Sequence, residues 1–117
     1  MQVTQIEYDH RLIDNLLNSR IRFAAIAYLL RESERSFVDI RECVNTTRGN
    51  LAIHLRKLEA ARYVECIKCF INHKSMSFYR VTGKGRTAFY QYSMHIQKFC
   101  IDDITIRASY ARMQHTL

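Results

Sequence analysis

The segment TTRGNLAIHLRKLEAARYV, residues 46–64, constrains the fold of this chain more than any other part. Its leucines at 51, 55 and 58 follow the i, i+4, i+7 spacing that places side chains on one face of an α-helix. Thr47 is a suitable N-cap for this helix, which we expect to end near Arg62. The opposite face carries Gly49, Asn50, Ile53, Arg56 and Lys57, and Arg48 and His54 flank the leucines. The segment therefore predicts a helix with one core-facing side and one polar, mostly basic side.

The rest of the chain also favours helices, because its 117 residues include no proline and only three glycines. This length suits a single domain spanning residues 1–117. No apolar run approaches the ~18 residues that a membrane span needs. The first ten residues are polar and lack the apolar core of a signal peptide. We therefore expect a soluble, cytoplasmic protein with no membrane partner.

Three segments before residue 46 show helical spacing. Residues 8–17 have four apolar side chains at i, i+1, i+4 and i+5, with Asp9 as a plausible cap, and predict a short amphipathic helix. Residues 20–31 are apolar on more than one side, which predicts a central helix. After a charged loop at 32–35, Ser36 and Asp39 have the spacing of a capping box. They predict a two-turn helix over 36–44, joined to the helix at 47–62 by a short turn at Asn45 and Thr46.

The periodicity changes after residue 62. The runs YVECIKCFI and SFYRV are rich in β-branched and aromatic residues and predict a hairpin, with Asn72, His73 and Lys74 at its tip. Thr82 then caps a long helix over 82–100, and a last short helix is expected over 104–114. The order predicts a mainly α fold with a small β-hairpin. Residues 9–81 form a helix-turn-helix and hairpin, and residues 82–117 form a C-terminal helical region.

The net charge of +7 is concentrated in one part of the chain. Residues 45–86 contain nine Lys or Arg side chains and two Glu side chains, a difference of +7, so the remaining charges cancel. A localised positive field of this kind attracts polyanions. A solubilising surface is the alternative, unless the charges also lie on a shape that fits a nucleic-acid groove.

The motifs TRGNLAIHLRKLEAARYVECIKCF and FYRVTGKGRTAFYQY carry a family resemblance. Over roughly residues 9–95 the chain resembles the small winged-helix transcriptional regulators of the MarR and ArsR types. The resemblance implies a winged helix-turn-helix with a long C-terminal dimerisation helix. It also implies sequence-specific binding of double-stranded DNA, to regulate transcription, by a homodimer. Arg62 departs from the family pattern, which has glycine at this helix end.

In a helix-turn-helix the second helix enters the major groove, and we expect helix 47–62 to do so with the wing at 64–81 on the flanking backbone. Arg48 is suited to guanine and Asn50 to adenine. Ile53 is expected to meet a thymine methyl or the chain's own hairpin. His54 flanks the core and is expected to be half-buried and hydrogen-bonded rather than a base reader. The full set of candidate DNA contacts is Thr47, Arg48, Asn50, Ile53, His54, Arg56, Lys57, His73 and Lys74.

The helix at 82–100 has more aromatic side chains than a monomer needs to bury, which is consistent with the dimer that the resemblance implies. Its candidate dimerisation residues are Phe89, Tyr92, Ile96 and Phe99. A two-fold dimer sets its recognition helices about one DNA turn apart, ~34 Å.

Two other functions stay open at this stage. The same basic surface could bind an acidic protein, as a winged-helix interaction module. The four cysteines, Cys43, Cys66, Cys69 and Cys100, could make a redox- or metal-responsive regulator. A metal site is not expected, because residues i and i+3 of a strand point to opposite faces and there is no second CxxC pair. No catalytic constellation or cofactor motif is apparent, so an enzyme is not expected.

Overall fold

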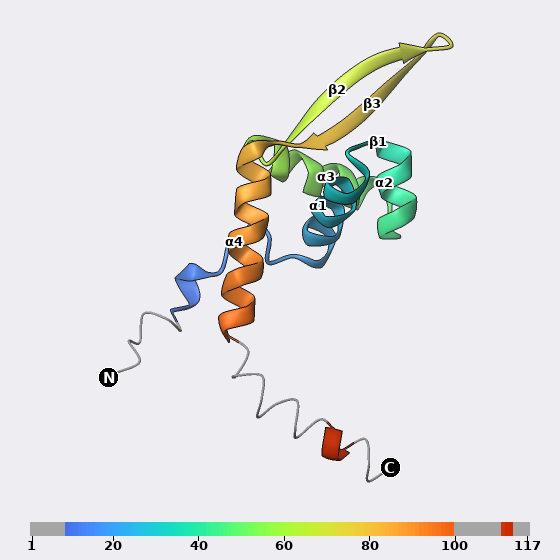
Figure 1. Ribbon diagram of the computed structural model, residues 1–117. Coiled ribbons are helices and arrows are strands. Elements are labelled where there is room, and N and C mark those ends of the chain that lie inside the picture. The colour runs from blue at the N-terminus through green and yellow to red at the C-terminus, as the bar shows by residue number, and fades with distance from the viewer. Residues whose placement is uncertain (1–8, 100–110, 114–117) are drawn as a thin grey trace.

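The computed structural model describes residues 9–99 and 111–113. Figure 1 shows a body of helices from which a long β-hairpin projects. The main elements are α1 (Arg20–Glu32), β1 (Glu34–Ser36), α2 (Phe37–Val44), α3 (Arg48–Ala60), β2 (Val64–Ile71), β3 (Lys74–Val81) and α4 (Gly83–Phe99). The helix-turn-helix is α2 and α3, and the wing is the hairpin of β2 and β3. The predicted winged helix-turn-helix is thus confirmed.

The helices begin where side chains cap them. The hydroxyl groups of Ser36 and Thr47 accept hydrogen bonds from the backbone N–H groups of Asp39 and Asn50, at 3.1 and 3.2 Å. Asn45 ends α2 in the left-handed conformation, with φ of 61°. The chain therefore turns sharply between α2 and α3, as expected for a helix-turn-helix.

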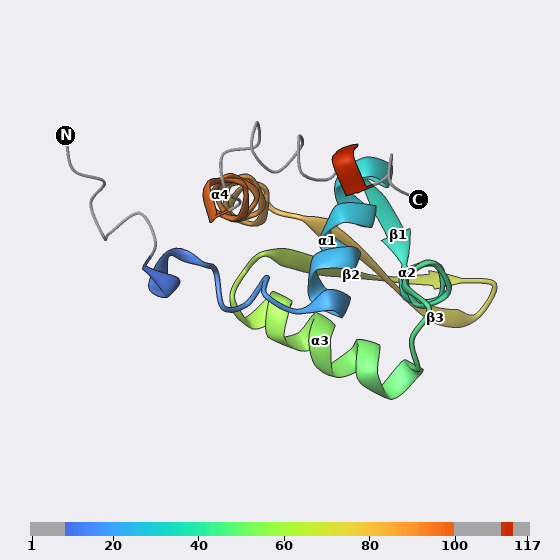
Figure 2. The same cartoon turned by 90° about the horizontal axis from the view of Figure 1, so that it is seen from below.

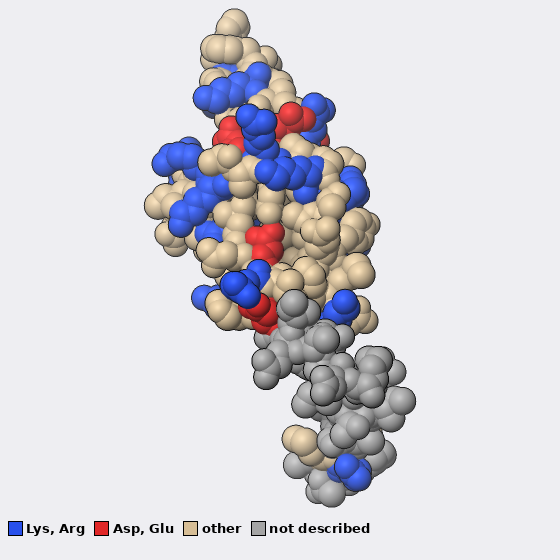
Figure 3. All heavy atoms as spheres, turned by 90° about the vertical axis from the view of Figure 1, so that its left-hand side faces the viewer, with Lys and Arg blue, Asp and Glu red and all other residues tan. Residues whose placement is uncertain are grey.

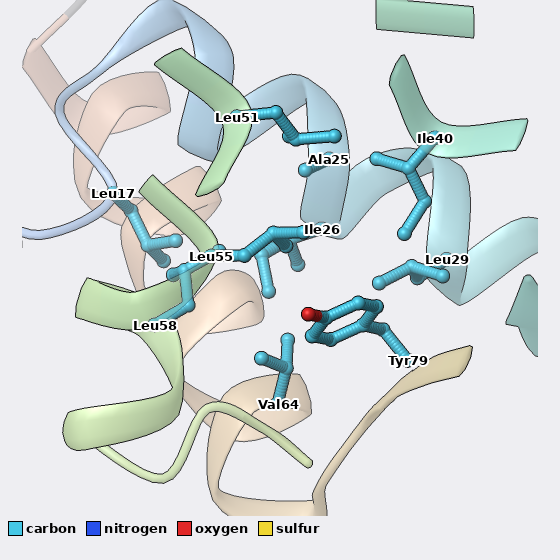
Figure 4. Packing of buried hydrophobic residues seen from close by; sticks show 10 residues of the cluster. All are labelled: Leu17, Ala25, Ile26, Leu29, Ile40, Leu51, Leu55, Leu58, Val64 and Tyr79. Atoms are coloured by element: carbon cyan, nitrogen blue, oxygen red, sulfur yellow. The ribbon is translucent and has the colours of Figure 1, made fainter. Parts of the chain in front are cut away.

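The core lies between α1, α2, α3 and the inner end of the hairpin (Figure 4). The leucines of the α3 stripe are almost completely buried, as their spacing predicted. The buried apolar residues are Leu17, Ala25, Ile26, Leu29, Ile40, Leu51, Leu55, Leu58, Val64 and Tyr79. Burial and a hydrogen bond with Cys66 raise the pKa of the Tyr79 hydroxyl. Because the leucine face of α3 packs into this core, the polar face of the helix is directed toward solvent.

The sheet has three antiparallel strands in the order β1-β3-β2. Strands β2 and β3 pair from Val64↔Val81 out to Ile71↔Lys74. Asn72 and His73 close the hairpin with φ values of 52° and 64°, the pattern of a two-residue type I′ turn. The wing is therefore a continuously paired ladder up to its tip, and Lys74 begins β3 instead of belonging to the turn.

Helix α4 packs against α1 (Figure 2). Thr82 precedes it and connects its first turn to the end of α3. Its hydroxyl donates to the Arg62 carbonyl at 2.6 Å, the same oxygen accepts from Gly85 N–H at 3.0 Å, and its backbone N–H donates to the Tyr63 carbonyl at 2.9 Å. Phe23 of α1 stacks on Phe89 with ring centroids 4.9 Å apart. These contacts join α4 to the winged-helix body.

Two sequence expectations about secondary structure were wrong. Residues 8–17 do not form one helix; the described part has a 3-10 helix at His10–Leu12, capped by Asp9, and then a turn. Here Asp14 accepts hydrogen bonds from the N–H groups of Leu16 and Leu17 and from the Tyr63 hydroxyl. The expected loop at 32–35 contains strand β1, which pairs with β3. In both cases a distant partner takes part: Tyr63 bonds Asp14, and β3 pairs with β1.

The expected strand at 77–81 begins earlier, at Lys74, so the segment after the tip is paired and not a turn. The last predicted helix, 104–114, and Cys100 lie largely or wholly outside the described residues. Within the part of the chain that the structure describes, no helix is both long enough and apolar enough to cross a membrane.

Helix α3 ends in a Schellman motif with an arginine at the position that favours glycine. The N–H of Tyr63 donates to the Leu58 carbonyl and the N–H of Arg62 to the Glu59 carbonyl, both at 2.9 Å. Arg62 has φ of 64°. A left-handed conformation costs a residue with a Cβ roughly 1–2 kcal/mol.

We therefore expect Arg62→Gly to stabilise the protein by about 0.5–1 kcal/mol, because relief of strain exceeds the added entropy of the unfolded chain. Urea unfolding measures the difference. Arg62→Ala is the matched control, since it removes the same charge but keeps the Cβ, and it should give no such gain. Equal stability of the glycine and alanine variants would contradict the assignment of strain to this position.

Candidate nucleic-acid interface

Helix α3 presents the polar side chains that the sequence singled out. Arg48, Asn50, Arg56 and Lys57 are all exposed. Ile53 is 50% exposed on the same helix, so it has not entered the core. These side chains lie on a helix whose other face is buried, and they are held by the core in fixed relation to one another. The fold therefore leaves the expected α3 residues exposed on the part of the helix that the leucine stripe does not bury.

Arg48 is oriented by the helix that precedes α3. Its guanidinium carbon lies 5.5 Å from the centre of the Phe37 ring. A guanidinium over an aromatic face is attracted by the electrons of the ring, which limits the directions that the side chain samples. The contact of Phe37 with Arg48 is a tertiary feature that the spacing of the sequence did not reveal.

Gly49 lies beside Arg48 in the first turn of α3. A Cβ built on Gly49 would meet no atom within 4 Å, so the space next to its backbone is open. No internal packing requires glycine here, although glycine weakens a helix by up to about 1 kcal/mol relative to alanine. The open space is consistent with the close approach of an external backbone, such as that of a nucleic acid.

Thr47 and His54 are engaged with the protein itself. The Thr47 hydroxyl oxygen caps α3, as described above. His54 is half-buried, and its Nδ1 lies 2.8 Å from an Arg22 guanidinium nitrogen of α1. Burial, together with the positive charges of Arg22 and Lys57, lowers the pKa of His54, so the ring is neutral at pH 7 and accepts this hydrogen bond. His54 thus lies at the margin of the surface, where it ties α3 to α1.

A groove of about 600 Å³ separates the start of α3 from the wing. Its lining residues are Ser36, Phe37, Val38, Arg48, Gly49, Ala52, Ser75, Met76, Ser77 and Tyr79. The α3 surface and the wing are thus two walls of one concave region. Sequence reasoning missed the serines of β3, because their place opposite α3 depends on strand register.

The wing carries its own exposed cations. His73 lies at the tip and Lys74 directly after it, both exposed, and Lys68 is exposed on β2. Arg80, nearer the body, pairs with Glu65 across the ladder at 2.5 Å. Among the described residues, Lys68 and Lys74 form no ion pair, so their charge is available to an external anion. Figure 3 shows one face of the molecule, on which Lys and Arg side chains are spread widely and several acidic side chains lie among them.

The cysteines do not converge on a site. Cys43 is exposed, and Cys66 and Cys69 are half-buried free thiols. Cys66 shares the core-facing side of the hairpin with Tyr79, whereas Cys69 pairs with Met76 on the other side. Within residues 9–99 and 111–113, no group of three or more His, Cys, Asp or Glu side chains is arranged to hold a metal ion.

The sequence matches the family model described as "Winged helix DNA-binding domain" over residues 21–100. The chain belongs to this winged helix family. The match includes both walls of the groove and the whole of α4. It confirms the expectation, first based on motifs, of a winged-helix DNA-binding domain.

Relatives and solved structures agree with the family. An uncharacterized protein of Methanocaldococcus jannaschii is 36% identical over 81 residues, which are 69% of this chain and 88% of that protein. The transcriptional regulator homologue from Pyrococcus horikoshii OT3 is similar in structure, with a TM-score of 0.71 at 22% identity, covering 79% of this chain and 91% of that one. A MarR family regulator from Silicibacter pomeroyi gives a TM-score of 0.58 at 18% identity, covering 87% and 72%. At these identities the structural matches show the winged-helix fold.

Proposed function

We propose that this protein binds specific sequences of double-stranded DNA, with α3 in the major groove and the wing on the flanking backbone, and so regulates transcription without catalysis. The observation that carries the proposal is that Arg48, Asn50 and Lys57 are all exposed on α3, while the leucine stripe of the same helix is buried in the core. The major groove admits a helix of this kind. Action on chromosomal DNA implies a cytoplasmic protein in a bacterial or archaeal cell.

The roles follow from geometry and chemistry. Arg48, held over Phe37 at the start of α3, is placed for a bidentate contact with guanine. Asn50 is suited to adenine, and Ile53 to a thymine methyl. Lys57 and Arg56, further along α3, are assigned to phosphates. His73 and Lys74 at the end of the wing are assigned to the backbone beyond the major-groove contacts.

A homodimer is part of the proposal, with residues 82–117 as the dimerisation region. Of the expected dimerisation residues, Phe89 and Tyr92 pack against Phe23 of the same chain. Ile96 is 36% exposed and Phe99 is half-buried. On the outer side of α4, Tyr90 and Met94 are 59% and 57% exposed, one helical turn apart. We assign the contact with a second copy to the outer side of α4, at Tyr90 and Met94, because Phe89 and Tyr92 already pack against Phe23 and Ile96 lies on their side of the helix.

Selection from a random library of duplexes of roughly 30 base pairs, long enough for two half-sites one turn apart, tests this function. The wild-type protein should recover a two-fold symmetric site. Arg48→Ala should relax the preference at one base pair of each half-site, at a cost of about 1–3 kcal/mol, while the other positions stay selected. Recovery of no consensus would contradict sequence-specific binding, and recovery of a single half-site would contradict the dimer.

A further inference from the structure

Phe70 is exposed in a way that the fold does not explain. It lies on β2, two residues before the turn of the wing, and its side chain is 79% exposed, more than any other large apolar side chain of the described residues. Alternate residues of β2 on the same side of the ladder become less covered toward the tip: Val64 is buried, Cys66 half-buried, and Lys68 and Phe70 exposed. The hairpin extends beyond the helical body (Figure 1), so the side of β2 that faces the core at Val64 is exposed near the tip.

The register places Phe70 next to the groove. Phe70 pairs with Ser75 and Lys68 pairs with Ser77. Paired residues of an antiparallel ladder lie on the same side of the sheet. Both serines line the groove together with Arg48 and Gly49 of α3. Phe70 therefore lies at the outer edge of the region that begins with the recognition helix.

The surroundings of Phe70 favour a polyanion as its partner. Lys68 lies two residues away on the same side of the strand, and Lys74 follows the turn; both are exposed and form no ion pair among the described residues. Proteins that bend DNA insert apolar side chains between base pairs from the minor groove, while basic side chains hold the phosphates on either side. Near the tip of the wing, Phe70 has one such lysine, Lys68, on its own side of the ladder and a second, Lys74, on the other side, since Lys74 pairs with Ile71.

We propose that Phe70 is an aromatic wedge that enters the minor groove beside the major-groove site and partly unstacks one base step. This inference rests on the proposed function and adds a deformation of the DNA to it. The continuous pairing of β2 and β3 up to Ile71↔Lys74 holds the ring in a fixed direction. Pyrimidine–purine steps unstack most easily, so specificity arises at flanking positions that make no hydrogen bond to the protein.

The test uses full-length protein and the duplex recovered by selection, with 2-aminopurine in place of adenine in the flanking steps. Wild-type protein should raise the fluorescence at one flanking step, because an unstacked 2-aminopurine is less quenched. Phe70→Ala should abolish this rise and weaken binding by about 10- to 100-fold, the range expected for loss of aromatic stacking. Phe70→Trp should retain both properties.

Ile71→Ala is the matched control, since Ile71 is also exposed on the wing but lies on the other side of the ladder. It should bind and unstack the duplex as the wild-type protein does. Wild-type affinity and fluorescence in Phe70→Ala would overturn the wedge and assign Phe70 to a protein partner, while leaving the proposed function intact. Failure of the proposed function itself is distinct, because the wild-type protein would then select no duplex.

Discussion

Gly85→Ala should destabilise this protein by about 3 kcal/mol or more, because overpacking against backbone leaves little room for relaxation. A Cβ on Gly85 would lie 2.1 Å from the Tyr63 carbonyl oxygen and 2.9 Å from its carbonyl carbon. The same carbonyl accepts the N–H of Thr82, so it is fixed by the start of α4. Tyr63 in turn is held by its hydroxyl, which donates to Asp14 at 2.6 Å. Urea or thermal unfolding of the variant measures the loss.

Gly83→Ala provides the control for this substitution, two residues away in the same helical turn. A Cβ on Gly83 meets no atom within 4 Å, and alanine is the better helix former. Gly83→Ala should therefore equal or slightly exceed the wild-type protein in stability. If the two variants unfold at the same urea concentration, the close approach of α4 to Tyr63 is not what requires glycine at position 85.

The combined variant Arg48→Ala, Lys57→Ala and Lys74→Ala should lose roughly 100- to 1,000-fold in affinity for the selected duplex, since it removes one base contact and two phosphate contacts. Its affinity should also depend less on salt. Each phosphate contact releases about one condensed counterion, so the logarithmic salt slope should fall by about two units. Fluorescence anisotropy at several salt concentrations gives both quantities.

The matched control removes three exposed cations outside residues 45–86 and outside the proposed dimerisation region, Arg11, Arg20 and Arg31. Its net charge equals that of the test variant, so any difference between the two reports position and not total charge. The control should stay within a few-fold of the wild-type affinity. Unchanged affinity in Arg48→Ala, Lys57→Ala and Lys74→Ala would refute the binding mode, even if another surface of the protein binds DNA.

The family and the fold agree well with the motifs because those motifs are local. The leucine stripe of α3 and the capping by Ser36 and Thr47 depend on residues within two helical turns of one another. The exposure of the basic face of α3 follows from burial of the opposite leucine face. Arg62 is a similar case: the family pattern marked it as a left-handed position, and the structure gives it φ of 64°.

Other features depended on contacts between distant parts of the chain. The short segment 34–36 became a strand because β3 offers a free edge, and nothing in its three residues indicates this. Phe89 and Tyr92 were expected at a dimer contact, but Phe23 of α1 lies against both. The ring of His54 faces Arg22, which is 32 positions earlier in the sequence. Periodicity predicts which face of a helix or strand is buried, but not which other element packs against that face.

The sequence by itself determined the helix-turn-helix, the hairpin, the positive charge of residues 45–86 and the side of α3 on which most of the candidate DNA contacts lie. These properties follow from spacing within single elements. Only the tertiary structure decided that Arg48 rests on Phe37, that serines of β3 face α3 across a groove, and that Phe70 stands uncovered on that side of the wing. The reason is physical: strand register and helix packing are set by the whole core, which no single segment contains.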